Sequence, residues 1–386
     1  MYRNTYVNID NQALTDNVKK ITTHYKNYQY FIGVVKANAY GHGIYIVNDL
    51  IKGGINYLAV SSLDEALEIR KYNQDIPILV LEPIDLKYLN IAETNHITIT
   101  IDSLIYTKEL LKNKFQNIKI HLKLDTGMNR LGFKNKEELE EAVSLLKKNN
   151  SLEIEGIYTH LATSGYNDKY YDKQIAKFMY LTTNIDLSSI KIVHLNRSIT
   201  LSNHTMLPFE TGTRLGIIMY GFNQCLKAPT GLRKIKYNII NQLNHISKTS
   251  PTNNFKLKEA YSLYTEVMSI RKVSKGEFIG YGASYKVTKD EYIATLPIGY
   301  ADGINENFKY VYINNLPYKI VGTICMDMTE VLIDDTINIH DLVEIIGPNQ
   351  NIRKVSRNLN TNAYHVLTMI TSRVPRKYLD NKIIKY

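Results

Sequence analysis

The stretch that decides the fold is YFIGVVKANAYGHG, residues 30–43. Its first six residues are apolar and rich in β-branched side chains, which predicts a buried strand over 30–35. Lys36 follows directly, and after it comes a loop with Gly41 and Gly43, where the backbone is able to approach a phosphate closely. Parallel α/β folds build their sites at the carboxyl ends of strands, so this loop is a candidate site.

Similar apolar runs recur through the first 220 residues and predict seven more strands, at 56–61, 77–82, 97–101, 118–125, 152–160, 190–195 and 213–219. Helical patterns lie between several of them. The clearest is 135–149, and 63–72 and 168–185 resemble it. Eight strands that alternate with helices favour a closed (β/α)₈ barrel of the TIM type, with an open doubly wound sheet as the alternative.

The pattern changes after about residue 230, where β-branched residues alternate with polar ones and helical spacing is rare. This change predicts a second, mostly β domain. We therefore expect an α/β chain in which residues 1–240 form the barrel and residues 241–386 form the β-rich C-terminal domain.

The composition excludes several classes of protein. Of 386 residues, 44% are hydrophobic and 22% charged, which is ordinary for a globular protein. No signal peptide and no membrane-spanning segment is evident, so we expect a cytoplasmic protein without a membrane partner. The net charge of +10 is spread along the chain, which argues against a nucleic-acid partner. Cys225 and Cys325 lack the spacing of a metal site, so no metal is expected.

Lys36 is the first candidate catalytic residue, because it ends a predicted barrel strand. A lysine amine attacks an aldehyde only in its neutral form, and burial at a barrel mouth favours that form. The alternative is a lysine that ends its strand and extends to solvent.

The predicted strand 118–125 has two faces. Its even-numbered residues are apolar, whereas Lys119, His121, Lys123 and Asp125 form the other face, which in a barrel points inward. Lys123 would then be desolvated close to Arg130, and two confined cations are costly without an anion. Either Asp125 supplies the negative charge or carbon dioxide carbamylates Lys123. An ordinary lysine in contact with water is also possible.

His160, Arg214 and Tyr281 are weaker candidates on pattern alone. His160 and Arg214 lie at strand ends, and Tyr281 is one of 30 tyrosines. These observations predict a barrel enzyme with a lysine nucleophile and leave its substrate open.

Motifs along nearly the whole chain resemble those of alanine racemases. In order, they are VVKANAYGHG (34–43), KLDTGMNRLG (123–132), GIYTHLATS (156–164), TRLGIIMYG (213–221), YGASY (281–285), PIGYADG (297–303), GTICMD (322–327) and SRVPR (372–376). The resemblance implies a pyridoxal 5'-phosphate-dependent isomerase with a barrel and a β domain, the latter joined by the first ten or so residues. It also implies a homodimer with shared active sites, which supplies D-alanine for cell-wall peptidoglycan.

The resemblance assigns roles to individual residues. Lys36 would bind the cofactor covalently and act as one base, and Tyr281 of the second subunit would be the other. The phosphate of the cofactor would contact Tyr40, Ser198, Gly216, Ile217 and Tyr364, and the rest of the cofactor would contact His160 and Arg214. Of these, His160 would hydrogen-bond Tyr281, and Arg214 would lie at the pyridine nitrogen. Arg130, Met326 and Tyr300 would contact the amino-acid substrate, and Lys123 would be the carbamylated lysine that orients Arg130.

Two positions depart from the family pattern. Arg197 replaces the usual asparagine before Ser198, and it either strengthens phosphate binding or points away. His365 replaces the customary glutamate after Tyr364. Three other functions remain as alternatives: a racemase of serine or of several amino acids, a fold-related basic-amino-acid decarboxylase, and a non-catalytic pyridoxal phosphate carrier.

Overall fold

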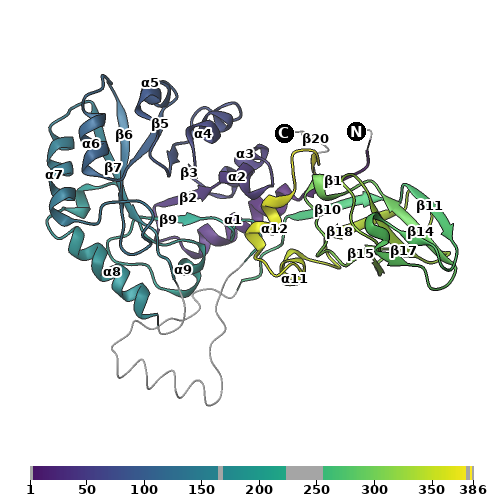
Figure 1. Ribbon diagram of the computed structural model, residues 1–386. Helices are drawn as coiled ribbons and strands as arrows, with labels where there is room; N and C mark the ends of the chain where they lie inside the picture. The colour runs from purple at the N-terminus through teal and green to yellow at the C-terminus, as the bar shows by residue number, and fades with distance from the viewer. Residues whose placement is uncertain (1–2, 164–167, 223–254, 380–382, 385–386) are drawn as a thin grey trace, which may run out of the picture. The chain divides into compact units, whose positions relative to one another are not determined.

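The computed structural model describes residues 3–163, 168–222 and 255–379, together with the backbone of strand β20 (Figure 1). The chain forms two compact units. The barrel unit comprises Ala13–Ala37 and Ile44–Glu259, and the β unit comprises Met1–Gln12, Asn38–Gly43 and Ala260–Tyr386. The boundary expected at residues 240 and 241 lies outside the described residues.

Eight parallel strands form the sheet of the barrel unit, in the order β8-β7-β6-β5-β4-β3-β2-β9. They are β2 (Tyr30–Val34), β3 (Tyr57–Val60), β4 (Ile78–Val80), β5 (Ile97–Ile101), β6 (Ile118–Leu124), β7 (Leu152–Thr159), β8 (Ile192–His194) and β9 (Gly212–Leu215). The sheet closes between β8 and β9, where the Thr211 N–H donates to the Val193 carbonyl (3.0 Å) and the Arg214 N–H donates to the Asn196 carbonyl (3.0 Å). The predicted barrel is confirmed, and the open sheet is wrong.

One predicted strand has the wrong extent. The apolar run 213–219 was expected to be extended throughout, but β9 ends at Leu215. The Met219 N–H donates to the Gly216 carbonyl and the Tyr220 N–H to the Ile217 carbonyl, so the chain turns there. These residues are apolar because they are buried in a turn, and burial alone does not distinguish a turn from a strand.

Helices of the barrel unit alternate with the strands. They are α1 (Asn11–His24), which begins in the β unit, α3 (Val47–Gly53), α4 (Leu63–Arg70), α5 (Leu89–Thr94), α6 (Leu104–Leu110), α7 (Lys136–Lys147), α8 (Lys169–Leu181) and α9 (Ser198–Asn203). Figure 1 shows α6 and α7 outside strands β5 to β7. Helix α7 confirms its predicted period, because Leu139, Ala142, Val143 and Leu146 are its buried residues. Asn135 caps it by accepting a hydrogen bond from the Glu138 N–H (3.0 Å).

The barrel interior is polar, and its side chains meet across non-adjacent strands. The Tyr57 hydroxyl of β3 donates to Glu155 of β7 (2.7 Å) and accepts a hydrogen bond from the Thr98 hydroxyl of β5 (2.8 Å). His121 of β6 is fully buried and contacts His194 of β8. The predicted inward face of β6 is therefore confirmed at His121.

The β unit contains three sheets. The largest has the order β16-β15-β18-β10-β1-β19-β20, the second has the order β11-β14-β17, and β12 pairs with β13. The strands are β1 (Tyr6–Ile9), β10 (Tyr261–Glu266), β11 (Ser269–Val273), β12 (Phe278–Ile279), β13 (Tyr285–Lys286), β14 (Glu291–Leu296), β15 (Tyr310–Ile313), β16 (Leu316–Lys319), β17 (Thr329–Ile333), β18 (Leu342–Ile346), β19 (Arg376–Tyr378) and β20 (Ile383–Ile384). Helices α11 (Ile352–Asn358) and α12 (Ala363–Met369) complete the unit.

A left-handed turn follows Lys36. The residues of α2 (Lys36–Tyr40) that come after the lysine, from Ala37 to Tyr40, all have φ of 52° or 53°, a conformation that costs an L-residue about 1–2 kcal/mol. Contacts inside the β unit hold the loop that follows: Arg376 Nε donates to the Gly41 carbonyl (3.0 Å), and the Tyr378 hydroxyl donates to the His42 carbonyl (3.0 Å). The strain is therefore maintained by residues more than 300 positions away.

None of the helices in the described part of the chain is long and apolar enough to cross a membrane.

Candidate active site

Lys36 lies just beyond the carboxyl end of β2 and is partly buried. Glu65 of α4 joins the backbone that follows Lys36 to the loop after β3. Its Oε1 accepts a hydrogen bond from the Ala37 N–H (2.7 Å), and its Oε2 accepts one from the Ser61 N–H (2.8 Å). The position of Lys36 is thus fixed by a residue that the sequence analysis did not single out.

Lys123 of β6 points inward, as predicted, and only 4% of it is exposed. Its Nζ donates to the Leu124 carbonyl (3.0 Å) and lies 5.1 Å from the centre of the Tyr158 ring. Burial, aided by the positive charge of Arg214, lowers the pKa of Lys123 to about 7. A large fraction of this amine is therefore neutral near pH 7 and able to react with carbon dioxide.

Asp125 does not hydrogen-bond Lys123. Its Oδ1 accepts hydrogen bonds from the N–H groups of Gly127 (2.9 Å) and Asn129 (3.0 Å), so it shapes the loop that carries Arg130. The Arg130 side chain is exposed, and among the described residues it forms no hydrogen bond. It is therefore available to a ligand carboxylate.

Arg214 of β9 is buried, with 3% exposed. Its Nη1 donates to His194 Nδ1 and to the His194 carbonyl, each at 2.7 Å. Its Nη2 donates to the carbonyls of Thr159 (2.7 Å) and Leu195 (3.0 Å). Burial lowers the pKa of Arg214 only to about 10, so the guanidinium stays charged. Its fifth donor, Nε–H, has no acceptor among the described residues, as expected for a group that binds a ligand.

His160 follows the end of β7 and is half-buried. Burial, together with the positive charges of Arg214 and Arg197, holds the pKa of His160 well below its ordinary value. The imidazole is therefore neutral, and it is able to accept or donate a hydrogen bond. Its ring contacts no hydrogen-bond partner in the described part of the chain, so the expected bond to Tyr281 stays a prediction.

Ser198 begins α9, and its Oγ accepts a hydrogen bond from the Gly216 N–H (2.9 Å). This bond joins the loop after β8 to the turn after β9, which contains Gly216 and Ile217. All three residues are buried. The structure thus brings together three of the five expected phosphate-binding residues within the barrel unit.

Arg197 binds the backbone of the loop after β7. Its Nε donates to the Leu161 carbonyl (2.9 Å), and its Nη2 lies 3.4 Å from the Ala162 carbonyl. The guanidinium thereby fixes the two residues that follow His160. The sequence analysis expected Arg197 either to strengthen phosphate binding or to point away, and neither alternative describes these contacts fully. Arg197 adds positive charge near His160 and anchors a loop.

Tyr40 and Tyr364, the other two expected phosphate residues, lie together in the β unit. Their ring centres are 5.8 Å apart. His365 is exposed, and its Nδ1 lies 3.0 Å from the Thr361 hydroxyl, so this departure contributes to the start of α12.

Tyr281, Tyr300 and Met326 lie on neighbouring loops of the β unit, with 74%, 52% and 53% of their surfaces exposed. The Thr323 hydroxyl donates to the Tyr281 carbonyl (3.2 Å), and the Tyr300 N–H donates to the Cys325 carbonyl (3.0 Å). These hydrogen bonds, with that from the Ala301 N–H to the Met326 carbonyl, hold the three exposed side chains on one set of loops.

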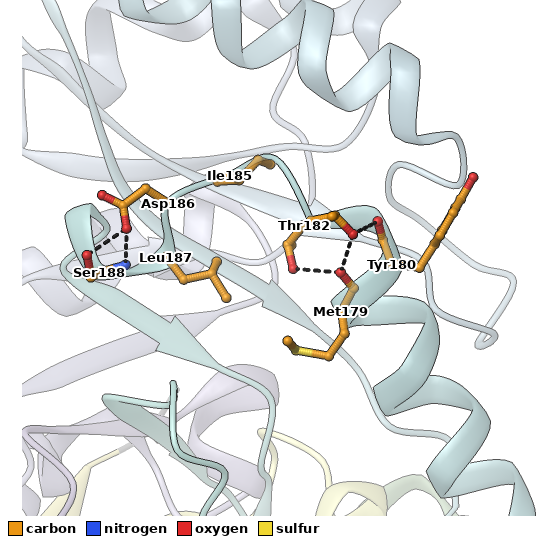
Figure 2. A pocket seen from close by; sticks show the side chains of 8 residues that line it. Met179, Tyr180, Thr182, Ile185, Asp186, Leu187 and Ser188 are labelled. Carbon is orange, nitrogen blue, oxygen red and sulfur yellow. Dashed lines mark hydrogen bonds between the residues drawn. The ribbon is translucent and has the colours of Figure 1, made fainter.

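Figure 2 shows a hollow elsewhere on the barrel unit, lined by residues 179–188 at the end of α8. It contains none of the predicted site residues. Asp186 Oδ1, its one charged group, accepts hydrogen bonds from the Ser188 N–H (3.0 Å) and hydroxyl (2.6 Å). This hollow is therefore not the candidate site.

The protein-family model of the alanine racemase N-terminal domain matches residues 9–224, and the family model of the alanine racemase C-terminal domain matches residues 260–378. The chain belongs to the alanine racemase family. Alanine racemases are isomerases, so this chain is an enzyme of that class. The alanine racemase of Anoxybacillus flavithermus is 33% identical over 395 residues, which cover 99% of this chain and 97% of that protein.

Solved structures of alanine racemases have the same fold. The E. faecalis alanine racemase superimposes with a TM-score of 0.85 at 30% identity and covers 98% of this chain and 99% of its own. A histidine racemase from Leuconostoc mesenteroides is also similar, with a TM-score of 0.82 at 26% identity over 98% of both chains. Racemases named for different substrates therefore share this fold.

Sequence reasoning missed Glu65, His194 and Glu210. Glu210 is buried, and it accepts hydrogen bonds from the N–H groups of Leu195 (2.9 Å) and Asn196 (2.7 Å), which hold the loop before Ser198. The only signal for Glu210 in the sequence was an acidic residue directly before TGTRLG. It was not sufficient, because acids in loops are usually exposed.

Proposed function

We propose that this chain interconverts L-alanine and D-alanine with pyridoxal 5'-phosphate as its cofactor. The observation that carries the proposal is Arg214, a buried guanidinium anchored by four hydrogen bonds with its Nε–H left for a ligand. An arginine donor suits a neutral ring nitrogen, whereas the rival decarboxylases place an acid there.

The cofactor would be held by the residues that the family resemblance assigns to it. Lys36 would bind its aldehyde carbon, Arg214 would donate to its ring nitrogen, and His160 would lie beside it. Its phosphate would contact Tyr40, Ser198, Gly216, Ile217 and Tyr364. When bound, pyridoxal phosphate withdraws electrons from the α-carbon of an amino acid and makes its hydrogen acidic.

Inversion at the α-carbon requires one base on each face. Lys36 Nζ would remove the proton from one enantiomer, and the Tyr281 hydroxyl would deliver a proton to the opposite face, with the roles reversed in the other direction. The neutral imidazole of His160 would hydrogen-bond Tyr281 and orient it.

The amino-acid substrate would be held by its carboxylate. Arg130 supports this role because it is exposed and has no protein acceptor among the described residues. Carbamylated Lys123 would accept a hydrogen bond from Arg130 and fix its direction. Met326 and Tyr300 would line the substrate site, and Tyr300 would limit its size.

Tyr281 would act in the active site of a second copy of the chain. Its 74% exposure supports this, because a base must be shielded from water to control one proton. Phe278 and Met328 add exposed apolar surface beside the same loops, at 55% and 43%, which favours a homodimer interface there.

A second candidate is a racemase of serine or of broad specificity, which the similarity to a histidine racemase supports. One methyl or hydroxyl group changes binding by only a few kcal/mol, so small changes around Tyr300 would be enough.

The non-catalytic carrier is disfavoured by the β unit with its Tyr281 loop. Family membership favours a cytoplasmic enzyme that supplies D-alanine for peptidoglycan.

The test is an enantiomer-conversion assay of the purified protein with alanine, serine, lysine and histidine, with and without added pyridoxal phosphate. We expect alanine to have the highest kcat/KM, and activity to require the cofactor. Faster conversion of another amino acid would favour the second candidate, and no conversion of any would contradict both.

A further inference from the structure

A line of buried polar side chains runs through the barrel beneath Arg214. Four consecutive strands supply one member each: His121 from β6, Glu155 from β7, His194 from β8 and Arg214 from β9. None is more than 3% exposed. The proposed function uses Arg214 alone, so the other three residues lack a role.

The hydrogen bonds of this line have a defined direction. Arginine only donates, so His194 Nδ1, 2.7 Å from Arg214 Nη1, must be the acceptor. A neutral His194 then carries its proton on Nε2, which lies 2.9 Å from His121 Nδ1 and donates to it. His121 in turn carries its proton on Nε2. This assignment assumes only that both rings are neutral. Burial supports the assumption, because it lowers the pKa of both histidines.

The line ends on a carboxylate. His121 Nε2 lies 3.6 Å from Glu155 Oε2, which is longer than a hydrogen bond, and it has no hydrogen-bond partner among the described residues. Burial alone would raise the pKa of Glu155, but its contacts with His121, Lys119 and Tyr57 outweigh that effect and hold the pKa well below the ordinary value. Glu155 is therefore an anion, and its negative charge faces the Nε2–H of His121 across 3.6 Å.

The backbone of β7 is irregular at this point. Lys119 pairs with Glu153 and Ile120 with Ile154, but His121 pairs with Gly156, so Glu155 is one extra residue. Such a bulge redirects a side chain. Gly156 then leaves room for the ring, because a Cβ there would lie 2.5 Å from both Cε1 and Nδ1 of His121. Two local departures from a regular strand thus accommodate the same pair of residues.

We propose that His121, together with His194 and Glu155, is a positioning residue for Arg214. It fixes the guanidinium so that the remaining Nε–H donates to the ring nitrogen of pyridoxal phosphate, which therefore stays unprotonated. This inference rests on the proposed function. An unprotonated ring withdraws less charge, so protonation returns to the α-carbon and the side reaction that converts alanine and pyridoxal phosphate into pyruvate and pyridoxamine phosphate is suppressed.

The first test uses the wild-type protein without cofactor. Isotope-edited NMR of the histidine ring nitrogens, with assignments from His121→Asn and His194→Asn variants, reports which nitrogen of each ring carries the proton. We expect both rings to be neutral and protonated on Nε2. Protonation of His194 on Nδ1 would overturn the proposal, and this readout does not depend on any activity.

The second test compares His121→Leu, which removes the acceptor for His194, with His121→Asn, whose amide oxygen is able to replace it. For the leucine variant we expect kcat to fall about tenfold or more, KM to change less than about twofold, and the ratio of pyruvate formed to alanine racemised to rise. In the asparagine variant, kcat and the pyruvate ratio should both return most of the way to the wild-type values. A ratio equal to that of the wild type in a folded leucine variant would contradict the proposal.

Gly156→Ala provides a variant with all four polar residues intact, because its methyl group displaces the His121 ring. It should raise the pyruvate ratio as the leucine variant does. If the wild-type protein racemises no amino acid, the proposed function fails. The NMR result still decides whether the hydrogen bonds from Arg214 through His194 to His121 exist.

Discussion

Two lysines compete for the role of cofactor-binding residue. Lys36 lies at the carboxyl end of β2, the strand that pairs with β9 through Ile32 and Arg214. Lys123 is more deeply buried, and its pKa of about 7 leaves a large fraction of its amine neutral and nucleophilic near neutrality. Position and reactivity therefore favour different residues.

We expect borohydride reduction of the protein loaded with pyridoxal phosphate to fix the cofactor on Lys36. Peptide mass mapping identifies the labelled lysine, and Lys36→Ala should lose the label while Lys123→Met keeps it. A label on Lys123 would refute the assignment of Lys36.

The buried Lys123 should also make stability depend on pH. Its folded-state pKa of about 7 lies below the ordinary 10.5, so between these values the unfolded chain binds more protons and stability rises with pH. In buffer free of carbon dioxide, Lys123→Met should raise the free energy of unfolding by a few kcal/mol below pH 7, and the gain should vanish as the pH approaches 10.5. Denaturant unfolding across this range measures the gain, and a gain that does not depend on pH would show that the titration of Lys123 is not its cause.

Carbamylation would remove the loss of stability that the buried positive charge causes, because it makes the Lys123 side chain negative. Wild-type protein in isotope-labelled bicarbonate should show a carbamate signal in carbon NMR and gain stability. Lys123→Met should show neither change. A wild-type protein that stays an unmodified amine in bicarbonate would exclude the modification.

At the scale of elements, the left-handed turn after Lys36 depends on Gly41. Its φ is 77°, and a Cβ there would lie 2.1 Å from the Leu367 carbonyl oxygen. We expect Gly41→Ala to lower the free energy of unfolding by at least about 2 kcal/mol more than Gly276→Ala. Gly276 is the matched control, because its φ is 96° but no atom lies within 4 Å of an added Cβ. Equal losses in the two variants would mean that the contact with Leu367 is not tight.

The strands were predictable and this turn was not. Buried parallel strands are continuous apolar runs, so all eight were found from the sequence, and α7 was found from its period. Ala37 and Ala39, by contrast, have no preference for a left-handed turn, and residues such as Arg376 decide their conformation. The bulge at Glu155 was missed for a related reason, because one extra residue breaks the alternation by which inward side chains are recognised. The strand-end position of Lys36 and the inward position of Lys123 were predictable because both follow from regular strands, whereas the roles of the two lysines stay predictions.

For the whole molecule, the shared-site model is testable by mixing inactive chains. Lys36→Ala and Tyr281→Phe homodimers should each be nearly inactive, because every site lacks one base. After subunit exchange about half the dimers are mixed, and each mixed dimer has one intact site if the two bases come from different chains. About a quarter of wild-type activity should therefore return. No recovery after exchange verified by native mass spectrometry would exclude a shared site.

The place of β1 has a consequence for synthesis of the chain on the ribosome. Residues Tyr6–Ile9 are made long before their neighbours in the sheet, which are β10, beginning at Tyr261, and β19, beginning at Arg376. At about 5–20 residues per second, β1 waits roughly 10 to 50 seconds for β10 and longer for β19. During that interval its hydrogen-bonding edges are unpaired while the barrel is being made. A nascent chain of this protein therefore exposes an unpaired strand until β10 has been made, and chaperone binding at β1 would be most useful during that interval.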